Sequence, residues 1–197
     1  MSHAVALPPP MTVAGFDVFL AAQPDDGAWE LVDGQILAMT NPSLDHADIV
    51  ANIAGALRPV MPADRRCRVT TGDVRVQASD DQRGVYAPRP DVMVWCGPKD
   101  GGRNYVTMPM VIVEVLSPSN MDTDRGAKLR FYKAGLPTLR HIALVYQDQM
   151  RVENYRRTDS GWELDVLTRP GDALRLGALL FEMPLAEVYA GVSLPAG

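Results

Sequence analysis

Hydrophobic and polar residues follow two different periods along the chain, and each period indicates one type of secondary structure. Alternating or continuously apolar runs predict strands over residues 29–39 (as a hairpin), 69–76, 86–95, 108–116, 141–146, 151–156, 162–167 and 174–176. Apolar residues at helical spacing predict helices over residues 16–23, 44–61 and 123–134, and a final helical turn at 184–189. This order of elements predicts an α/β or α+β fold with one mixed sheet and two main helices.

Short polar signals mark the ends of several predicted elements. Asp33 and Gly34 stand between two apolar runs and form a sequence pair that strongly predicts a tight hairpin. The segment Asn41-Pro42-Ser43 offers an N-cap for the helix that begins near Leu44. Gly135 ends the last long helix.

The chain shows no internal repeat, no low-complexity tract and no linker long enough to divide it. We therefore expect a flexible leader over residues 1–12 and a single domain over residues 13–197. No apolar run approaches the roughly 20 residues that cross a bilayer, and the first ten residues lack the basic start of a signal peptide. These features predict a cytoplasmic protein that does not span a membrane.

The net charge and the two cysteines bear on two possibilities, nucleic-acid binding and a zinc site. The formal net charge of −5 offers no global attraction for nucleic acid. Local basic clusters at Arg65–Arg68 and Arg125–Lys133 could still form a rim around a site, with a solvated face as the alternative. Cys67 and Cys96 lie in predicted strands and lack Cys-x-x-Cys spacing, so we expect two reduced thiols in or near the core rather than a zinc site.

Two carboxylates interrupt otherwise apolar strand-like runs. Asp91 precedes Val-Met-Val, and Glu114 lies within Val-Ile-Val-Glu-Val-Leu. A buried carboxylate costs several kcal/mol unless a partner compensates it. If the two strands run back side by side, the acids could share one divalent cation, since Mg²⁺ prefers hard oxygen ligands. The alternatives are a turn position before a strand for Asp91 and a solvated face for Glu114.

Three further residues are candidates for the same site. Lys128 shares a helix face with Tyr132 and could stabilise charge on a phosphate, although a surface lysine is the alternative. His46, near a helix start, could contact a phosphate, act as a base or ligate a metal, or could simply be a partly exposed histidine. Glu30 could add a carboxylate, with an ordinary acid at the edge of the hairpin as the alternative.

Several of these residues belong to strings that resemble one protein family. The strings are Glu30–Gly34, Asn41–Ser43 with His46, Arg89–Val92, Val113–Ser119, and Asp124 followed by Lys128, Tyr132 and Gly135. Over roughly residues 15–190 the chain resembles the Uma-type restriction endonucleases of the PD-(D/E)XK nuclease superfamily. The resemblance implies a restriction-endonuclease-like fold, in which four core strands form a mixed sheet flanked by helices, with additional N- and C-terminal strands.

The resemblance also implies roles for single residues. Asp91 and Glu114 would be the metal-binding acids. The superfamily usually carries a lysine two residues after the second acid, where this chain has Leu116. The resemblance therefore implies that Lys128 on the helix takes the place of that lysine.

Two hypotheses of different classes follow. The first is an endodeoxyribonuclease that depends on Mg²⁺ or Mn²⁺, in which Asp91 and Glu114 hold the metal, Lys128 stabilises the phosphate, and His46 or Glu30 assists. DNA is the expected substrate, RNA is the alternative, and a homodimer would suit the cutting of two strands. The second is a catalytically inactive nucleic-acid-binding or interaction module that keeps the nuclease fold. A metal hydrolase for a small phosphorylated substrate would fit the acids but not the resemblance.

Overall fold

A computed structural model describes residues 9–23, 28–39, 41–64, 66–78, 84–98, 104–118 and 120–194. Most of the leader expected at residues 1–12 lies outside the described residues. Within the described part of the chain, no helix is long and apolar enough to cross a bilayer.

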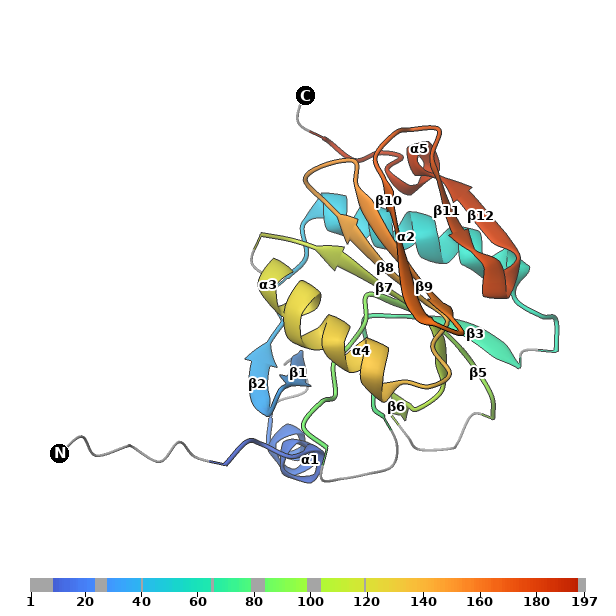
Figure 1. Cartoon of the computed structure of the whole chain (residues 1–197). Coiled ribbons are helices and arrows are strands. Elements are labelled where there is room, and N and C mark those ends of the chain that lie inside the picture. Colours follow the sequence, from blue (N-terminus) through green and yellow to red (C-terminus); the bar gives the residue numbers. More distant parts are fainter. Residues whose placement is uncertain are drawn as a thin grey trace.

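A six-stranded mixed sheet forms the centre of the molecule (Figure 1). Its strands are β3 (Cys67–Thr71), β5 (Val92–Cys96), β7 (Pro109–Leu116), β8 (His141–Tyr146), β9 (Val152–Thr158) and β10 (Gly161–Leu167). They lie in the order β10-β9-β8-β7-β5-β3. Only the β7–β8 pair is parallel among these neighbours, and a parallel pair needs a crossover connection. The mixed sheet expected from the sequence is thereby confirmed.

Helices cover both faces of this sheet. The crossover from β7 to β8 is one helical stretch composed of α3 (Met121–Thr123), the π-helical turn η2 (Asp124–Lys128) and α4 (Leu129–Gly135). It lies over the face that carries Ile112 and Leu116. On the opposite face, α2 (Leu44–Leu57) and α5 (Leu185–Val188) pack on the other side chains of the same strands. Residue alternation along β7 therefore decides which helix each side chain meets.

The N-terminal elements form a small third cluster beside the sheet. They are α1 (Val13–Ala21), β1 (Trp29–Val32) and β2 (Gln35–Ala38). The predicted hairpin is confirmed, because Asp33 and Gly34 both have positive φ angles of 51° and 73°. A side chain at Gly34 would also meet Pro10, since a Cβ atom there would lie 2.3 Å from the Cβ of Pro10.

Some predicted boundaries are wrong for identifiable reasons. The single strand expected over 69–76 is divided at Gly72, whose φ of 54° turns the chain, and its second half is β4 (Arg75–Val76), which pairs with β6 (Tyr105–Val106). The helix expected over 44–61 ends at Leu57 and continues as the 3-10 turn η1 (Arg58–Val60), which contains a proline. Near the C-terminus β11 (Ala173–Leu176) pairs with β12 (Phe181–Pro184), which the pattern did not predict, and η3 (Gly177–Leu179) joins them.

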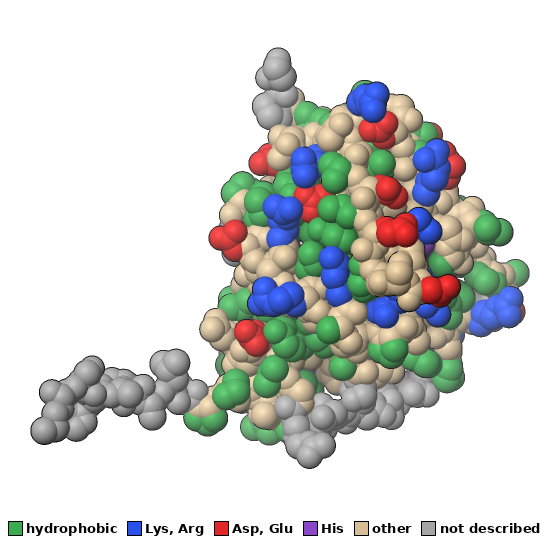
Figure 2. Space-filling model, viewed as in Figure 1, with side chains coloured by type: hydrophobic (Ala, Val, Ile, Leu, Met, Phe, Trp, Pro, Cys, Tyr) green, Lys and Arg blue, Asp and Glu red, His purple; other side chains and the backbone are tan. Residues whose placement is uncertain are grey.

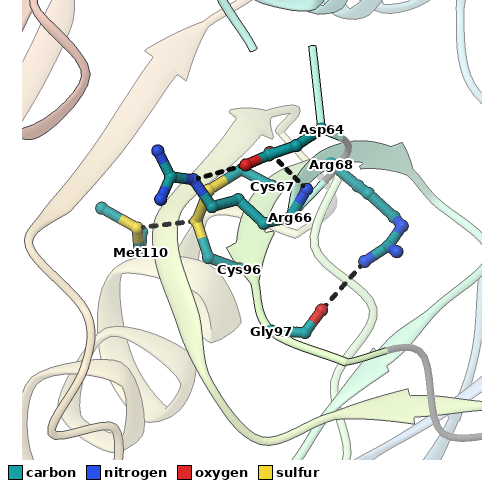
Figure 3. Close-up of a disulfide and its surroundings, with 7 residues drawn as sticks. All are labelled: Asp64, Arg66, Cys67, Arg68, Cys96, Gly97 and Met110. Atoms are coloured by element: carbon teal, nitrogen blue, oxygen red, sulfur yellow. Dashed lines mark hydrogen bonds and ion pairs between the residues drawn. A yellow bond between two sulfur atoms is a disulfide. The ribbon is translucent and has the colours of Figure 1, made fainter. Parts of the chain in front are cut away.

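Cys67 and Cys96 form a disulfide, so the expectation of two reduced thiols is wrong (Figure 3). The two cysteines are direct cross-strand partners in the register of β3 and β5, with their Cα atoms 4.0 Å apart. The Sδ atom of Met110 lies 3.0 Å from the Sγ atom of Cys96. The bridge ties β3, the outermost described strand on this side of the sheet, to its neighbour β5.

Candidate functional site

Glu114 is buried on β7, with its side chain only 2% exposed. It faces the crossover helix, and its Oε1 accepts a hydrogen bond of 2.5 Å from the hydroxyl of Tyr132 on α4. Burial raises the pKa of Glu114 well above its usual range, and the nearby carboxylates of Asp124 and Asp91 raise it further, while Lys128 and the Tyr132 hydrogen bond act in the opposite direction. The solvated-face alternative for Glu114 is therefore wrong.

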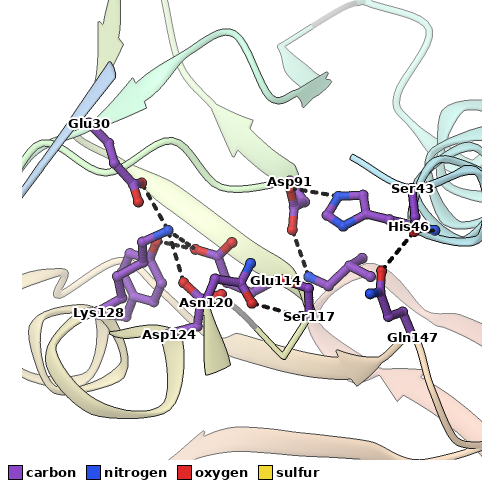
Figure 4. A network of polar contacts seen from close by, with 12 residues as sticks. Glu30, Ser43, His46, Asp91, Glu114, Ser117, Asn120, Asp124, Lys128 and Gln147 are labelled. Carbon is purple, nitrogen blue, oxygen red and sulfur yellow. Dashed lines mark hydrogen bonds and ion pairs between the residues drawn. The ribbon is translucent and has the colours of Figure 1, made fainter. Parts of the chain in front are cut away.

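Lys128 lies at the centre of the acidic cluster (Figure 4). Its Nζ atom is 2.9 Å from Oε2 of Glu30, 2.9 Å from Oδ1 of Asp124 and 3.8 Å from Oε1 of Glu114. The side chain is 5% exposed, so the surface-lysine alternative is wrong. Burial alone would lower the pKa of Lys128, but the surrounding carboxylates raise it well above its usual range. The lysine is therefore held as a cation.

The π-helical turn η2 delivers both Lys128 and Asp124 to the cluster. Their four-residue separation places the two charges 2.9 Å apart on the buried side of the helix. Burial raises the pKa of Asp124 to about 6, although Lys128 lowers it. π turns occur often at functional sites. Sequence reasoning assigned Asp124 no role, and the signal that could have found it was its i, i+4 spacing to Lys128.

Asp91 lies immediately before β5 rather than within a strand, so the turn-position alternative describes its backbone correctly. Its side chain nevertheless belongs to the site. Oδ2 accepts a hydrogen bond of 2.7 Å from the backbone N–H of Val115, and Oδ1 lies 3.1 Å from Nε2 of His46. Because Val92 pairs with Val113, Asp91 stands opposite Glu114 at the next position of the register.

His46 reaches Asp91 from the first turn of α2. The predicted N-cap is confirmed at Ser43, whose hydroxyl accepts a hydrogen bond of 3.1 Å from the backbone N–H of His46. The same hydroxyl lies 3.0 Å from Oε1 of Gln147, directly after β8. The cap that begins the helix therefore also fixes the residue that contacts Asp91.

Glu30 completes the cluster from β1. Its Oε2 atom contacts Lys128 and accepts a hydrogen bond of 3.3 Å from the backbone N–H of Arg89, two residues before Asp91. The structure thus brings together all five residues expected from the sequence, Glu30, His46, Asp91, Glu114 and Lys128 (Figure 4). It adds Asp124 and Tyr132 to them.

The donor set fits a hard divalent cation. Glu30, Glu114 and Asp124 are three carboxylates grouped around a single ammonium ion, and Asp91 stands opposite Glu114 in the sheet register. Repulsion from Asp124 and Asp91 is part of what raises the pKa of Glu114. Among the described residues, no three His, Cys, Asp or Glu side chains are placed to hold a metal by themselves. Mg²⁺ commonly needs only one or two carboxylates, and takes its other ligands from water and substrate phosphate. Asp91 and Glu114 fit that pattern.

Comparisons with known proteins identify the family of this chain. Residues 16–186 match the Uma2 family model, which is described as "Putative restriction endonuclease". The chain is 30% identical over 165 residues to the uncharacterized protein slr1290 of Synechocystis, covering 83% of this chain and 84% of that protein. It is 32% identical over 142 residues to a second Synechocystis protein, sll1609, covering 70% and 77% of the two chains.

A solved structure shares the fold. It is the crystal structure of a protein from Anabaena variabilis described as a "putative nuclease belonging to DUF820". The TM-score is 0.72 at 18% sequence identity, and the match covers 92% of this chain and 98% of that chain. At this identity the likeness concerns the arrangement of helices and strands alone.

Proposed function

The chain belongs to the Uma2 family of restriction-endonuclease-like proteins, and from this premise we propose that it hydrolyses phosphodiester bonds in DNA with the help of a divalent cation, Mg²⁺ or Mn²⁺. The observation that carries the proposal is the position of Lys128, buried among Glu30, Asp124 and Glu114. An ordinary surface lysine would not bring its charge to the second acid of a nuclease motif.

In the proposed mechanism, Asp91 and Glu114 hold the ion. When bound, such an ion polarises a phosphate oxygen and makes water a better nucleophile. Lys128 stabilises the negative charge that develops on the phosphate, because a fixed cation in a water-poor site is most effective where charge builds up. Glu30 and Asp124 keep the lysine charged and oriented.

Two residues position the acids in this mechanism. The hydroxyl of Tyr132 donates a hydrogen bond to Glu114 and so fixes the direction in which that carboxylate points. His46 contacts one oxygen of Asp91 while the Val115 amide holds the other, which leaves the Asp91 side chain little freedom. Preorganised groups of this kind need no rearrangement during the reaction.

Cleavage of supercoiled plasmid DNA with Mg²⁺ or Mn²⁺ tests the proposal. We expect the wild-type protein to nick or cut the plasmid, and Glu114→Gln and Lys128→Met to lose this activity. Lys133→Met is a matched control, because Lys133 lies on the same helical stretch but stands over the ring of Tyr155 rather than among the acids. Cleavage that persists in Glu114→Gln would contradict the mechanism. Gel filtration would test the homodimer that we propose for cutting two strands.

The rival proposal is a non-catalytic module with the same fold. Leu116 occupies the usual lysine position of the superfamily motif, and Lys128 already pairs closely with two acids other than Glu114. A module of this kind would bind nucleic acid without cutting it at any divalent-ion concentration. Binding and cleavage therefore have to be measured separately.

A further inference from the structure

A second buried carboxylate lies in line with Glu114 across the sheet. Glu114 on β7 pairs with Leu144 on β8, and Leu144 pairs with Glu153 on β9. Cross-strand partners point to the same face of a sheet, so both acids face the crossover helix. Two strand spacings separate them, which corresponds to about 10 Å.

Glu153 is held by four donors. Its side chain is 1% exposed and accepts hydrogen bonds from Arg125 at 2.9 and 3.1 Å and from Arg151 at 3.0 Å. The hydroxyls of Tyr146 and Tyr155 donate to the same carboxylate at 2.9 and 3.1 Å. Burial raises the pKa of Glu153, but the bonds from Arg151, Tyr146 and the other donors outweigh it and leave the pKa below its usual range. The group is therefore an anion.

One carboxylate neutralises only one of the two arginines, so this cluster carries a surplus positive charge. The Arg125 side chain is 45% exposed and the Arg151 side chain is 34% exposed. Each guanidinium has five N–H donors and uses its Nη2 group toward Glu153. Both guanidiniums also lie near the ring of Tyr146, 5.9 and 5.4 Å from its centre. The two guanidinium groups are thus fixed in place, while part of each arginine side chain remains exposed to solvent.

The surplus charge lies in the part of the chain where positive charge is concentrated. Residues 125–157 contain eight of the 19 Lys and Arg residues but only two of the 24 Asp and Glu residues. Figure 2 views this side of the molecule and shows basic side chains, with acidic side chains among them, over the crossover helix and the neighbouring strands. A chain with a net charge of −5 therefore has a segment, running from the crossover helix through β9, in which basic residues outnumber acidic ones.

We propose that Arg125 and Arg151, positioned by Glu153, bind a backbone phosphate of nucleic acid next to the phosphodiester that the Glu114–Lys128 site hydrolyses. The proposal rests on the proposed function and specifies where its substrate lies. Arg125 and Lys128 come from the same π turn, so one rigid segment sets the spacing between the flanking phosphate and the reacting one. A planar guanidinium fork matches phosphate geometry, which is the reason that arginine is common at such contacts.

Salt-dependent DNA binding tests this inference. Fluorescence anisotropy with a short labelled duplex in EDTA measures affinity without hydrolysis, over a range of KCl concentrations. Each phosphate contact that is lost should reduce the slope of log K against log salt by about 0.9. We expect Arg125→Gln and Arg151→Gln each to show that reduction, with roughly tenfold weaker binding at low salt. Arg151→Lys should keep the slope and lose only part of the affinity, because it keeps the charge but not the fork.

Arg156→Gln is the matched control. Arg156 lies on the same strand as Glu153 but on the opposite face, where it is exposed and paired with Glu163. The Arg156→Gln variant should show the same slope of log K against log salt as the wild type. Thermal melting of every variant checks that the cluster itself still folds, and Arg151→Lys retains the ion pair if Arg151→Gln does not.

The outcomes separate the two proposals. Wild-type slopes in both Arg125→Gln and Arg151→Gln would overturn the inference, and so would a wild-type protein that binds no duplex at any salt concentration. If these variants lose slope while the wild type never cleaves DNA with Mg²⁺ or Mn²⁺, the phosphate site stands and the proposed hydrolysis fails. If the wild type cleaves DNA and the slopes do not change, the hydrolysis stands and the phosphate site fails.

Discussion

The ammonium group of Lys128 lies 3.8 Å from the carboxylate of Glu114, farther than the 2.9 Å that separates it from Glu30 and from Asp124. Lys128 is therefore the counter-ion of the whole acidic cluster and not the partner of one acid. Removal of its charge would leave several buried carboxylates without a cation.

We accordingly expect Lys128→Met to affect stability as well as activity. Breaking a buried ion pair by removing one partner typically costs about 3–5 kcal/mol. Urea unfolding at neutral pH should show a loss of that size, while Lys133→Met on the same helical stretch should change the free energy of unfolding much less. A Lys128→Met protein as stable as the wild type would show that the acids take up protons at little cost.

Divalent cations should stabilise the folded protein through Glu114. Binding to the folded state alone adds about 2.7 kcal/mol at a cation concentration one hundred times the dissociation constant. We expect Mn²⁺ to raise the melting temperature of the wild type and of Glu163→Gln, a control at an exposed acid, but not that of Glu114→Gln. Equal shifts in all three proteins would place the ion elsewhere.

The free energy of unfolding should depend on pH because Asp124 titrates at a different pH in the folded and unfolded states. Its pKa is about 6 in the folded state and 3.8 when unperturbed, so the folded state holds a proton that the unfolded state releases. Stability from this group is present at low pH and is lost as the pH rises from about 4 through about 6. The rise in the pKa of Asp124 from 3.8 to about 6 contributes at most about 3 kcal/mol to the free energy of unfolding at low pH.

The substitution Asp124→Asn should remove the loss of stability between about pH 4 and pH 6. We expect the free energy of unfolding of the wild type, measured relative to the variant in urea at several pH values, to decline between pH 4 and pH 7. Asp122→Asn, an exposed position on the same helical stretch, is the control and should follow the wild type. A constant difference between wild type and Asp124→Asn would mean that Asp124 remains ionised throughout.

The disulfide should contribute measurably to stability. Cys67 and Cys96 are 29 residues apart, and closing a loop of that length stabilises a protein by roughly 3–4 kcal/mol in the chain-entropy account. Dithiothreitol should lower the urea midpoint of the wild type by a corresponding amount. The double variant Cys67→Ala with Cys96→Ala should already be at the lower value and should not respond. A wild type that is indifferent to reductant would restore the expectation of two free thiols.

Local sequence signals predicted the parts of the site that depend on local structure. Glu114 was identifiable because apolar neighbours on its own strand face left no reason for an exposed acid. Asp33 and Gly34 predicted the hairpin that carries Glu30, and Ser43 predicted the helix start that places His46. In each case the residues that set the geometry are within a few positions of the candidate residue.

Relationships between distant segments were not predictable in the same way. The burial of Asp124 depends on where the π turn sets the helix against β7; the i, i+4 spacing to Lys128 indicates that the two residues pair but not that the pair is buried. The pairing of Cys67 with Cys96 depends on the register of β3 against β5. The backbone donor to Asp91, the amide of Val115, carries no side-chain signal at all.

The row formed by Glu114, Leu144 and Glu153 also constrains the order in which the chain can assemble. When the crossover helix covers this face of β7, β8 and β9, it buries two acids that lie in one row about 10 Å apart. The cations that neutralise them, Lys128 and Arg125, both come from the five residues of η2. The central strands and the crossover helix should therefore form in one cooperative step, and their backbone amides should exchange with solvent together as a single unit.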